Sequence, residues 1–279
     1  RLLPWINHGW HVALRITPRG ALTRPLPAGE RHFTAELDFL AGAIRVECEN
    51  GAQERLPVAG KTIAAVEREL SALLARLGLP APLHGAPNEL PDPVPFAEDE
   101  RPREWDGDAA RRLHAAFLGA DRNLGAFRSL YRGKTSPSHL FWGSFDLAVT
   151  RFSGRTAPVH PGGVPHLPDA VTREAYSHEV ISAGFWPGGG GFDQAAFYAY
   201  AYPTPAGLAR AEVAPAGALW SADLGEFLLP YAAVRAAADP DAAVQAFLHA
   251  TFDAAAALLD WPGELVIGPR PTYGRPPTP

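Results

Sequence analysis

Two segments in the second half of the chain gather the residue types that could do chemistry. Residues 138–155 read SHLFWGSFDLAVTRFSGR, and residues 176–191 read YSHEVISAGFWPGGGG. Histidine, aspartate, glutamate and arginine stand there among residues that favour strands. Because a buried polar group destabilises a protein unless it is hydrogen-bonded, this concentration indicates a candidate ligand site.

His178 and Asp146 are the predicted catalytic residues. An imidazole and a carboxyl group exchange protons readily when they share a site, and the small neighbours of Asp146 leave room for a ligand. In a strand over residues 175–185, His178 and Glu179 lie on opposite faces, so they do not serve one pocket. The His-Glu pair also lacks the second histidine of a zinc-protease helix. A hydrogen-bonded structural role is the alternative for His178.

Further residues of the same region are predicted to bind the ligand. Arg151 and Arg155 suit an anion, because a guanidinium group can donate two parallel hydrogen bonds to a carboxylate or phosphate. Arg151 falls on the apolar side of its strand, so a structural ion pair is the alternative for these charges. The other predicted ligand-binding residues are Trp142, Tyr200, His139 and Glu179.

Two nearby patterns add to this candidate site. The alternating sequence FYAYAY at residues 197–202 places three tyrosines on one face of a strand, where they line a pocket or pack across strands. Glycines at residues 188–191 resemble a phosphate loop, but no Lys-Ser/Thr pair follows them and no helix begins there. A turn, able to act as a lid beside a pocket, is the better interpretation.

No motif demands a metal, and the sequence leaves the cofactor unknown. His139, His178 and a carboxylate are suitable zinc ligands, but their spacing does not require zinc. On a strand, His8 and His11 have opposite parity, which argues against a shared metal. The single cysteine, Cys48, excludes an intrachain disulfide and a cysteine-based zinc site. We therefore predict no metal ligands.

The elements that must position these residues follow from the periodicity of apolar side chains. Strands are expected at residues 10–17, 33–40, 43–49, 53–56, 140–152, 175–185 and 196–202. Helices are expected at residues 62–77, 108–131, 224–238 and 240–261, the third broken or kinked at Pro230. Alternating strands disfavour a parallel doubly wound sheet. The predicted fold is α+β, a mainly antiparallel sheet with amphipathic helices packed on one face.

A chain of 279 residues forms one large domain or two small ones. We expect an N-terminal α+β half at residues 1–86, a proline-rich acidic connector at 87–107, a C-terminal α+β half at 108–261 and a proline-rich tail at 262–279. A weak echo between LRITPRG at residues 14–20 and LAVTRFSG at residues 147–154 fits two pseudo-repeated halves, or chance.

Charge and hydropathy restrict the partners. A net charge of −5 argues against general nucleic-acid binding, which needs a basic face. No apolar run reaches the roughly 18 residues of a membrane span, and one free thiol fits the cytoplasm. The expected partner is a small-molecule ligand or substrate, with neither nucleic acid nor membrane. The absence of methionine, even at position 1, suggests that a natural N-terminal segment is missing.

Five longer motifs carry a family resemblance. They are PWINHGWHV at residues 4–12, PNELPDPVPF at 87–96, FWGSFDLAVTRFSGR at 141–155, YSHEVISAGFWPGGG at 176–190 and FYAYAYP at 197–203. Together they resemble a bacterial family known only as domain of unknown function 5996, from about Leu3 to Trp261. The resemblance implies a further N-terminal segment. It implies no activity, cofactor or catalytic residue.

Three classes of function fit these observations. The first is an enzyme that acts on a small polar or anionic molecule by acid–base chemistry of His178 and Asp146. The second is a non-catalytic binding protein with an aromatic pocket, and the third is a structural protein whose motifs only pack the sheet. An enzyme of this kind needs its imidazole and carboxyl groups within about 3 Å of each other or of a bridging water, and a binding protein does not.

Overall fold

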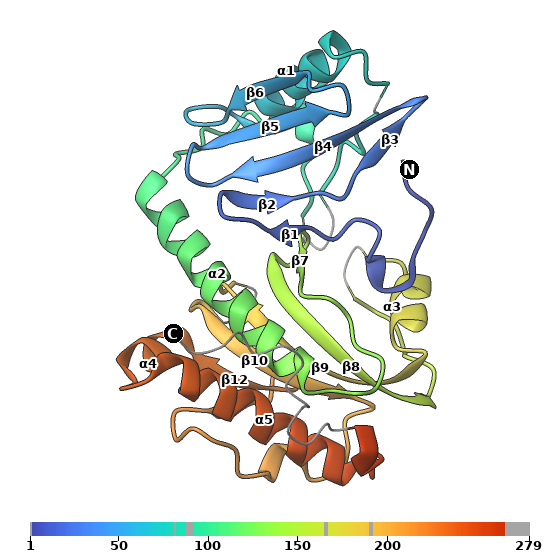
Figure 1. Cartoon of the computed structure of the whole chain (residues 1–279), viewed down its shortest axis with the longest axis vertical. Coiled ribbons are helices and arrows are strands. Elements are labelled where there is room, and N and C mark those ends of the chain that lie inside the picture. Colours follow the sequence, from blue (N-terminus) through green and yellow to red (C-terminus); the bar gives the residue numbers. More distant parts are fainter. Residues whose placement is uncertain (1, 81, 88–91, 165–166, 190–191, 266–279) are drawn as a thin grey trace, which may run out of the picture.

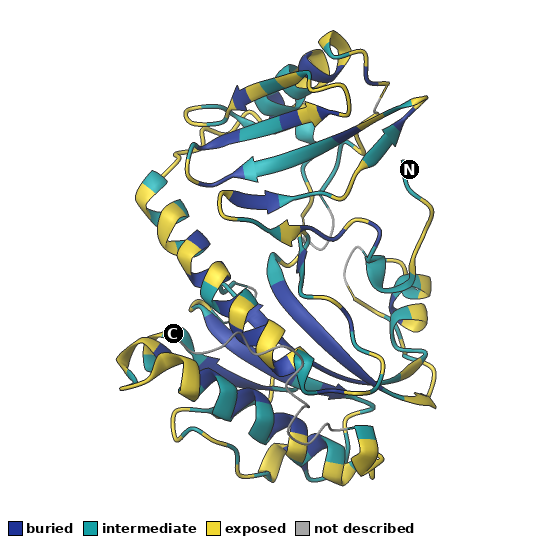
Figure 2. Ribbon diagram, viewed as in Figure 1, coloured by how far each residue is buried: buried dark blue, intermediate teal, exposed yellow. Residues whose placement is uncertain are grey.

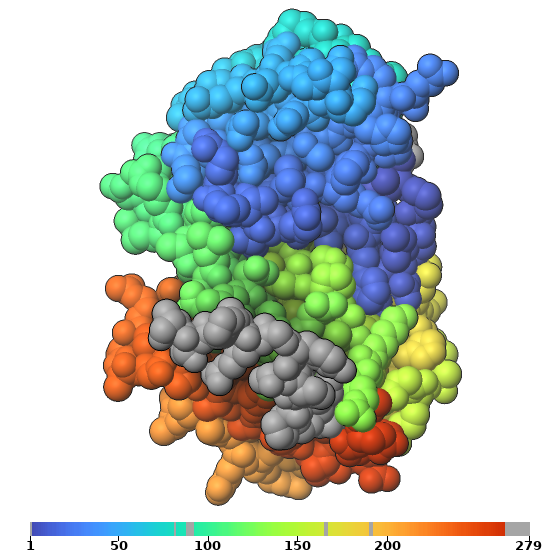
Figure 3. Space-filling view, viewed as in Figure 1, coloured from blue at the N-terminus to red at the C-terminus, as the bar shows by residue number. Residues whose placement is uncertain are grey.

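The computed structural model describes residues 2–80, 82–87, 92–164, 167–189 and 192–265. Within these ranges the chain forms two six-stranded antiparallel sheets, one from each half of the sequence. The two sheets are stacked along the long axis of the molecule (Figure 1). In the space-filling view the N-terminal half rests directly on the second half (Figure 3). The α+β prediction is confirmed.

The first sheet has the strand order β1-β2-β4-β5-β6, with β3 paired to β4. Its strands are β1 (Arg15–Ile16), β2 (Gly20–Leu22), β3 (Leu26–Ala28), β4 (Arg31–Asp38), β5 (Ala43–Cys48) and β6 (Gln53–Pro57). Helix α1 (Ile63–Arg76) begins where the Thr62 side chain accepts a hydrogen bond from the amide of Ala65. Its buried residues Leu73 and Leu74 pack on the apolar side chains of this sheet.

The second sheet has the strand order β11-β12-β10-β9-β8-β7. Its strands are β7 (His139–Phe141), β8 (Asp146–Thr156), β9 (His178–Trp186), β10 (Ala196–Tyr202), β11 (Leu219–Ser221) and β12 (Glu226–Pro230). Helices α2 (Gly107–Ser129), α4 (Tyr231–Ala236) and α5 (Pro240–Leu258) cover one face of it. The strands are mostly buried, whereas each helix is buried along one side only (Figure 2).

Strand alternation divides the side chains of the second sheet between two environments. Odd-numbered apolar residues such as Leu147, Val149 and Phe185 belong to the core shared with α2 and α5. Even-numbered residues of β8, β9 and β10 project to the other face. Helix α3 (Asp169–Ala175) and the short 3-10 helix η1 (Asn7–Gly9) contact each other on that side. This face therefore lies between the sheet and segments distant in sequence.

Several predicted elements differ from those observed. The helix expected at residues 224–238 is confirmed only after Pro230, where α4 begins. Its first part is wrong, because residues 227–230 pair with β10 and bury Phe227, Leu228 and Leu229. Residues 10–17 form only β1 and a single bridge, since Leu14 pairs with Leu140 of the second sheet. Helix α3 lies between the strands expected at residues 140–152 and 175–185, where no helix was predicted. Tertiary contacts override the local pattern in these segments.

The predicted division of the chain stays a prediction, and two observations bear on it. Leu14, Ala21 and Phe39 of the first half belong to the same core cluster as α2 and α5. Thr17 accepts hydrogen bonds in the turn between β1 and β2, whereas Thr150 lies inside β8, so the sequence echo occupies unlike elements. Of the expected tail, residues 266–279 lie outside the described residues. No helix in the described part is long and apolar enough to cross a membrane.

Candidate functional site

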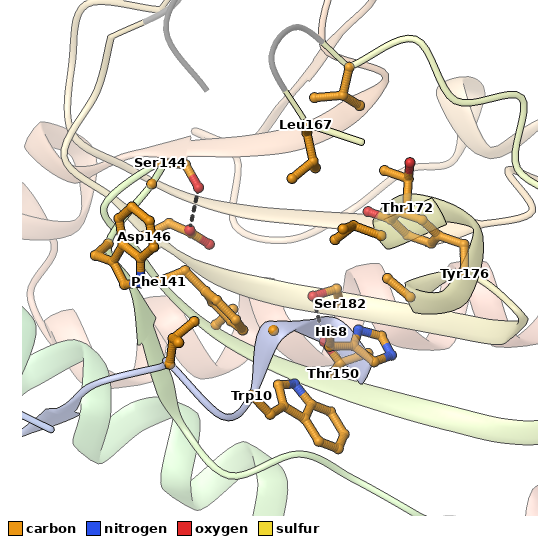
Figure 4. Close-up of a pocket in the computed structure, with 18 of the residues that line it drawn as sticks. His8, Trp10, Phe141, Ser144, Asp146, Thr150, Leu167, Thr172, Tyr176 and Ser182 are labelled. Carbon is orange, nitrogen blue, oxygen red and sulfur yellow. Dashed lines mark hydrogen bonds between the residues drawn. The ribbon is translucent and has the colours of Figure 1, made fainter. Parts of the chain in front are cut away.

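A cavity of about 650 Å³ lies on the even-numbered face of the second sheet. Strands β8, β9 and β10 form its floor, and the turn between β7 and β8 closes one end (Figure 4). The N-terminal segment around η1 forms one wall, and α3 with the loop before it forms another. The N-terminal segment and strands from the second half of the sequence thus enclose one space.

The floor of the cavity is a row of hydroxyl groups across three strands. Thr150 of β8 pairs with Ser182 of β9, which in turn pairs with Tyr200 of β10. The Oγ1 atom of Thr150 and the Oγ atom of Ser182 lie 3.0 Å apart (Figure 4). The Tyr200 hydroxyl lies 2.9 Å from that of Tyr176, which follows α3. Hydroxyl groups both donate and accept hydrogen bonds, so this floor suits a polar ligand.

Asp146 lies at the start of β8 and is held by two hydroxyl groups. Ser144 donates to its Oδ1 atom at 2.8 Å, and Tyr198 of β10 donates to its Oδ2 atom. Tyr198 must cross β9 to reach β8. Gly184 permits this, because a Cβ atom there would lie 2.5 Å from the Tyr198 hydroxyl.

Two carboxyl groups share this face of the sheet. Burial raises the pKa of Asp146 above its usual range, against the opposing effect of its hydrogen bonds. Glu226, at the start of β12, has its pKa raised to about 7 by burial and then by the charge of Asp146. Neither carboxyl belongs to an ion pair within the described part of the chain. Their negative charge is therefore not balanced by a protein cation.

The tyrosines around these carboxyl groups remain protonated. Burial raises the pKa of Tyr176, and it raises the pKa values of Tyr198 and Tyr200 well above the usual value. Nearby carboxylates strengthen the effect, because a phenolate beside a carboxylate is unfavourable. The three hydroxyl groups are thus hydrogen-bonding groups rather than bases near neutral pH.

The N-terminal wall is aromatic and carries strained backbone. The rings of His8 and Trp10 are stacked with their centroids 4.9 Å apart. Burial lowers the pKa of His8 to about 4, so its imidazole is neutral at pH 7. His8 and Phe145, which precedes Asp146, have φ values of 62° and 59°. This left-handed conformation is unfavourable for a side chain with a Cβ, and such residues concentrate at binding sites.

A model of the Family of unknown function (DUF5996) matches residues 1–267. The chain belongs to this family. Comparison with curated proteins and with solved structures finds no match. Within the described residues, no three His, Cys, Asp or Glu side chains come together as a metal site.

The structure does not bring His178 together with Asp146. Both residues have the parity of the cavity face, but His178 pairs with Thr156 at the far end of β8. The ten residues from Asp146 to Thr156 correspond to about 30 Å of strand. His178 is exposed, lies outside the cavity lining, and has its Nδ1 atom 3.0 Å from the hydroxyl of Ser177. His178 and Asp146 therefore do not share one pocket, contrary to the prediction.

Neither predicted anion-binding arginine lines the cavity. Arg151 is 1% exposed and lies in the core on the opposite face, with its guanidinium 3.4 Å from the ring centre of Phe127 and 4.3 Å from that of Phe252. It donates to the backbone carbonyl of Phe127. Arg155 pairs with Glu179 at 2.9 Å, so both residues form a surface ion pair. Arg151 lies in the core because odd-numbered residues of β8 face the helices.

Of the remaining predicted residues, Trp142 and Tyr200 line the cavity, as does Asp146. His139 has the parity of the cavity face, but it lies beneath Trp10 and Phe141 and outside the lining. Burial lowers the pKa of His139 to about 4.

Sequence reasoning missed other residues that form the site. Tyr176 and the N-terminal wall lie far from Asp146 in sequence, and no local pattern connects them. Glu226, expected at a helix start, lies on the same face of the sheet but outside the cavity lining. The alternation in FYAYAY is the one signal that indicated Tyr198.

Proposed function

We propose that this protein binds a small, polar, non-anionic organic molecule in the cavity, without converting it. The observation that supports this proposal is a cavity whose floor presents carboxyl and hydroxyl groups and whose walls are aromatic. A volume of about 650 Å³ falls in the usual range of ligand sites. Polar groups such as Asp146 and Tyr200 would fix the orientation of the ligand, and tryptophan rings would supply apolar contact.

The charge of the cavity argues against an anionic ligand. Among the described lining residues there is no lysine or arginine. His8 is neutral at pH 7 because burial lowers its pKa to about 4. An anion would lie beside Asp146 without a compensating cation, which is unfavourable in a partly desolvated site. A neutral or cationic ligand fits the electrostatics better.

A second candidate is an enzyme that uses Asp146 for acid–base catalysis. The specific observation is the position of Asp146 in the cavity, between the hydroxyl groups of Ser144 and Tyr198. Burial raises its pKa above the usual range, which brings a carboxyl group closer to the pH at which it can both donate and accept a proton. Conversion of a bound compound would favour this candidate, and binding without turnover favours the first.

The test is a thermal-shift screen of the whole chain with uncharged, cationic and anionic small polar compounds, followed by calorimetry and product analysis. Ligand binding to the folded state raises the melting temperature. Stabilisation by uncharged or cationic compounds is the expected result. A preference for anions, or no stabilisation by any compound, would contradict the proposal.

A matched pair of variants ties binding to the cavity. Tyr198→Phe removes the hydroxyl that donates to Asp146 and keeps the ring. Tyr202→Phe makes the same change on the same strand, but the Tyr202 hydroxyl donates to the carbonyl of Pro158 and does not line the cavity. We expect Tyr198→Phe to weaken binding about tenfold, which corresponds to about 1.4 kcal/mol, and Tyr202→Phe to leave it unchanged. Equal losses in both variants would place the ligand elsewhere.

A further inference from the structure

We infer that the ligand carries an ammonium group, which binds to the carboxyl group of Asp146. This inference rests on the proposed function and specifies the chemical class of the ligand. Three observations support it: Asp146 has no cationic partner among the described residues, its oxygens have free acceptor positions, and the walls of the cavity are aromatic.

The first argument is the absence of a protein cation at this site. Elsewhere in the described chain, well-buried carboxylates are paired with arginine: Asp38 contacts Arg19 at 2.5 Å, and Asp99 contacts Arg101 at 2.6 Å. Asp146 instead accepts hydrogen bonds from the hydroxyl groups of Ser144 and Tyr198, and no arginine or lysine of the described residues forms an ion pair with it. A bound ammonium ion would take the place that arginine occupies in the other pairs.

The second argument is the direction of the hydrogen bonds. An ionised carboxylate offers about four acceptor positions, and Asp146 receives one hydroxyl hydrogen bond on each oxygen. Positions on both oxygens therefore remain free to accept. The hydroxyl pair of Tyr176 and Tyr200 offers further acceptor oxygens on the cavity floor. An ammonium group carries only donors, so it complements this set, whereas a ligand hydroxyl would use one donor.

The third argument is the aromatic character of the walls. Tryptophan is the best aromatic partner for a cation, and three tryptophans line the cavity: Trp5, Trp10 and Trp142. Their rings are electron-rich on the face, so a cation is stabilised there as well as at the carboxyl group of Asp146. A carboxyl floor and aromatic walls together discriminate a cation from a neutral molecule of the same shape.

The binding of a cation should also release protons. Burial raises the pKa of Asp146, and a nearby positive charge favours its ionised form. The other titratable groups on this cavity are the tyrosines at 176, 198 and 200 and the histidines at 8, 11, 84 and 160. Affinity for an amine should therefore increase as the pH rises through the pKa of Asp146.

The experiment uses three carbon skeletons, propyl, cyclohexyl and 2-phenylethyl, each as the amine, the alcohol and the carboxylate. Melting temperature and calorimetric affinity of the whole chain are measured at constant ionic strength. We expect an amine to bind at least tenfold more tightly than its matched alcohol. If alcohols bind as tightly as amines, the inference fails and the proposed function stands. If no compound binds, both fail.

Variants separate the carboxyl group of the cavity from general electrostatics. Asp146→Asn should abolish the preference for the amine over the alcohol. Glu179→Gln removes a carboxylate from the same sheet outside the cavity and should leave the preference intact. If Asp146→Asn does not fold, as judged by circular dichroism, the ratio of amine to alcohol affinity in the unchanged chain decides the inference. An unchanged preference in a folded variant would overturn the inference.

Discussion

The buried carboxyl groups of the two sheets differ in their partners and in the direction of their pKa shifts. In the first sheet the fully buried Asp38 pairs with Arg19 and accepts a hydrogen bond from the amide of Ala41. Burial alone would raise the pKa of Asp38, but these partners outweigh it and the pKa is lowered. On the cavity face of the second sheet, Asp146 and Glu226 lack such a partner and have raised pKa values.

The difference separates charge that the protein balances itself from charge that it leaves unbalanced. The pair of Asp38 and Arg19 balances its own charge, so it can stabilise the turn between β4 and β5 without any ligand. Within the described residues, the charge of Asp146 in the cavity has no such partner. Arg151, on the helix-covered face of the same sheet, has no ion-pair partner among the described residues either, and its guanidinium lies against aromatic rings.

The largest effect is expected from a substitution that disrupts the cavity face of the second sheet without changing a charge. In Gly184→Ala the new Cβ would lie 2.3 Å from the carbonyl oxygen of Leu147 and 2.5 Å from the hydroxyl of Tyr198. We expect the free energy of unfolding to fall by about 3 kcal/mol, because neither the strand nor the tyrosine can move freely. Urea denaturation measures this. A loss below about 1 kcal/mol would contradict the close approach, and Gly119→Ala, with open space around it, is the control.

The next largest effect is expected when the ion pair of the first sheet is removed. Asp38→Asn removes the ion pair with Arg19, and we expect a loss of about 2 kcal/mol at pH 7, since Arg19 is half exposed. The folded-state pKa of Asp38 is lowered, so this stability is present above the unfolded value near 3.9 and disappears as the pH falls through the folded pKa. Denaturation of both proteins at pH 7 and at pH 3 checks it. An equal difference at both pH values would be evidence against the ion pair.

The pH dependence of Glu226 should have the opposite sign. Its folded-state pKa of about 7 exceeds the unfolded value near 4.3, so the folded state is favoured at low pH and loses this contribution between about pH 4.5 and pH 7. Glutamine stays neutral at every pH, so Glu226→Gln should remove this pH-dependent decline in the free energy of unfolding. We expect the decline to be about 1–2 kcal/mol, because Glu226 is partly exposed. Melting curves from pH 4 to pH 8 test this. A parallel profile in the variant would refute the raised pKa.

The smallest effect is expected from Asp146→Asn, and it tests the difference between the two sheets most directly. Asp146→Asn is chemically identical to Asp38→Asn, but it removes a carboxyl group that has no cationic partner. The amide oxygen can still accept a hydrogen bond from Tyr198, so we expect a change within about 1 kcal/mol, or a slight stabilisation. Thermal denaturation at pH 7 measures it. A loss as large as that of Asp38→Asn would end the distinction between the two regions.

Much of the fold follows from local patterns, and the site follows only in part. Alternation predicts β4, β5 and β10 closely, and Thr62 and Asp239 mark the starts of α1 and α5. Parity also assigns Asp146 and Tyr200 to one face of the sheet. Parity does not fix position along a strand, however, and the register that pairs Leu147 with Phe185 places His178 at the distant end. Register and the N-terminal wall depend on long-range packing.

Residues 5–12 form one wall of the cavity, although the strands of its floor come much later in the sequence. The indole of Trp5 donates to Glu174 of α3 at 2.5 Å, and its ring lies 4.9 Å from that of His11. The stack of His8 on Trp10 and the bridge between Leu14 and Leu140 also hold this segment. Both parts of the chain must therefore fold together before the cavity is enclosed. A fragment limited to the second sheet and its helices would have the floor of the cavity without this wall.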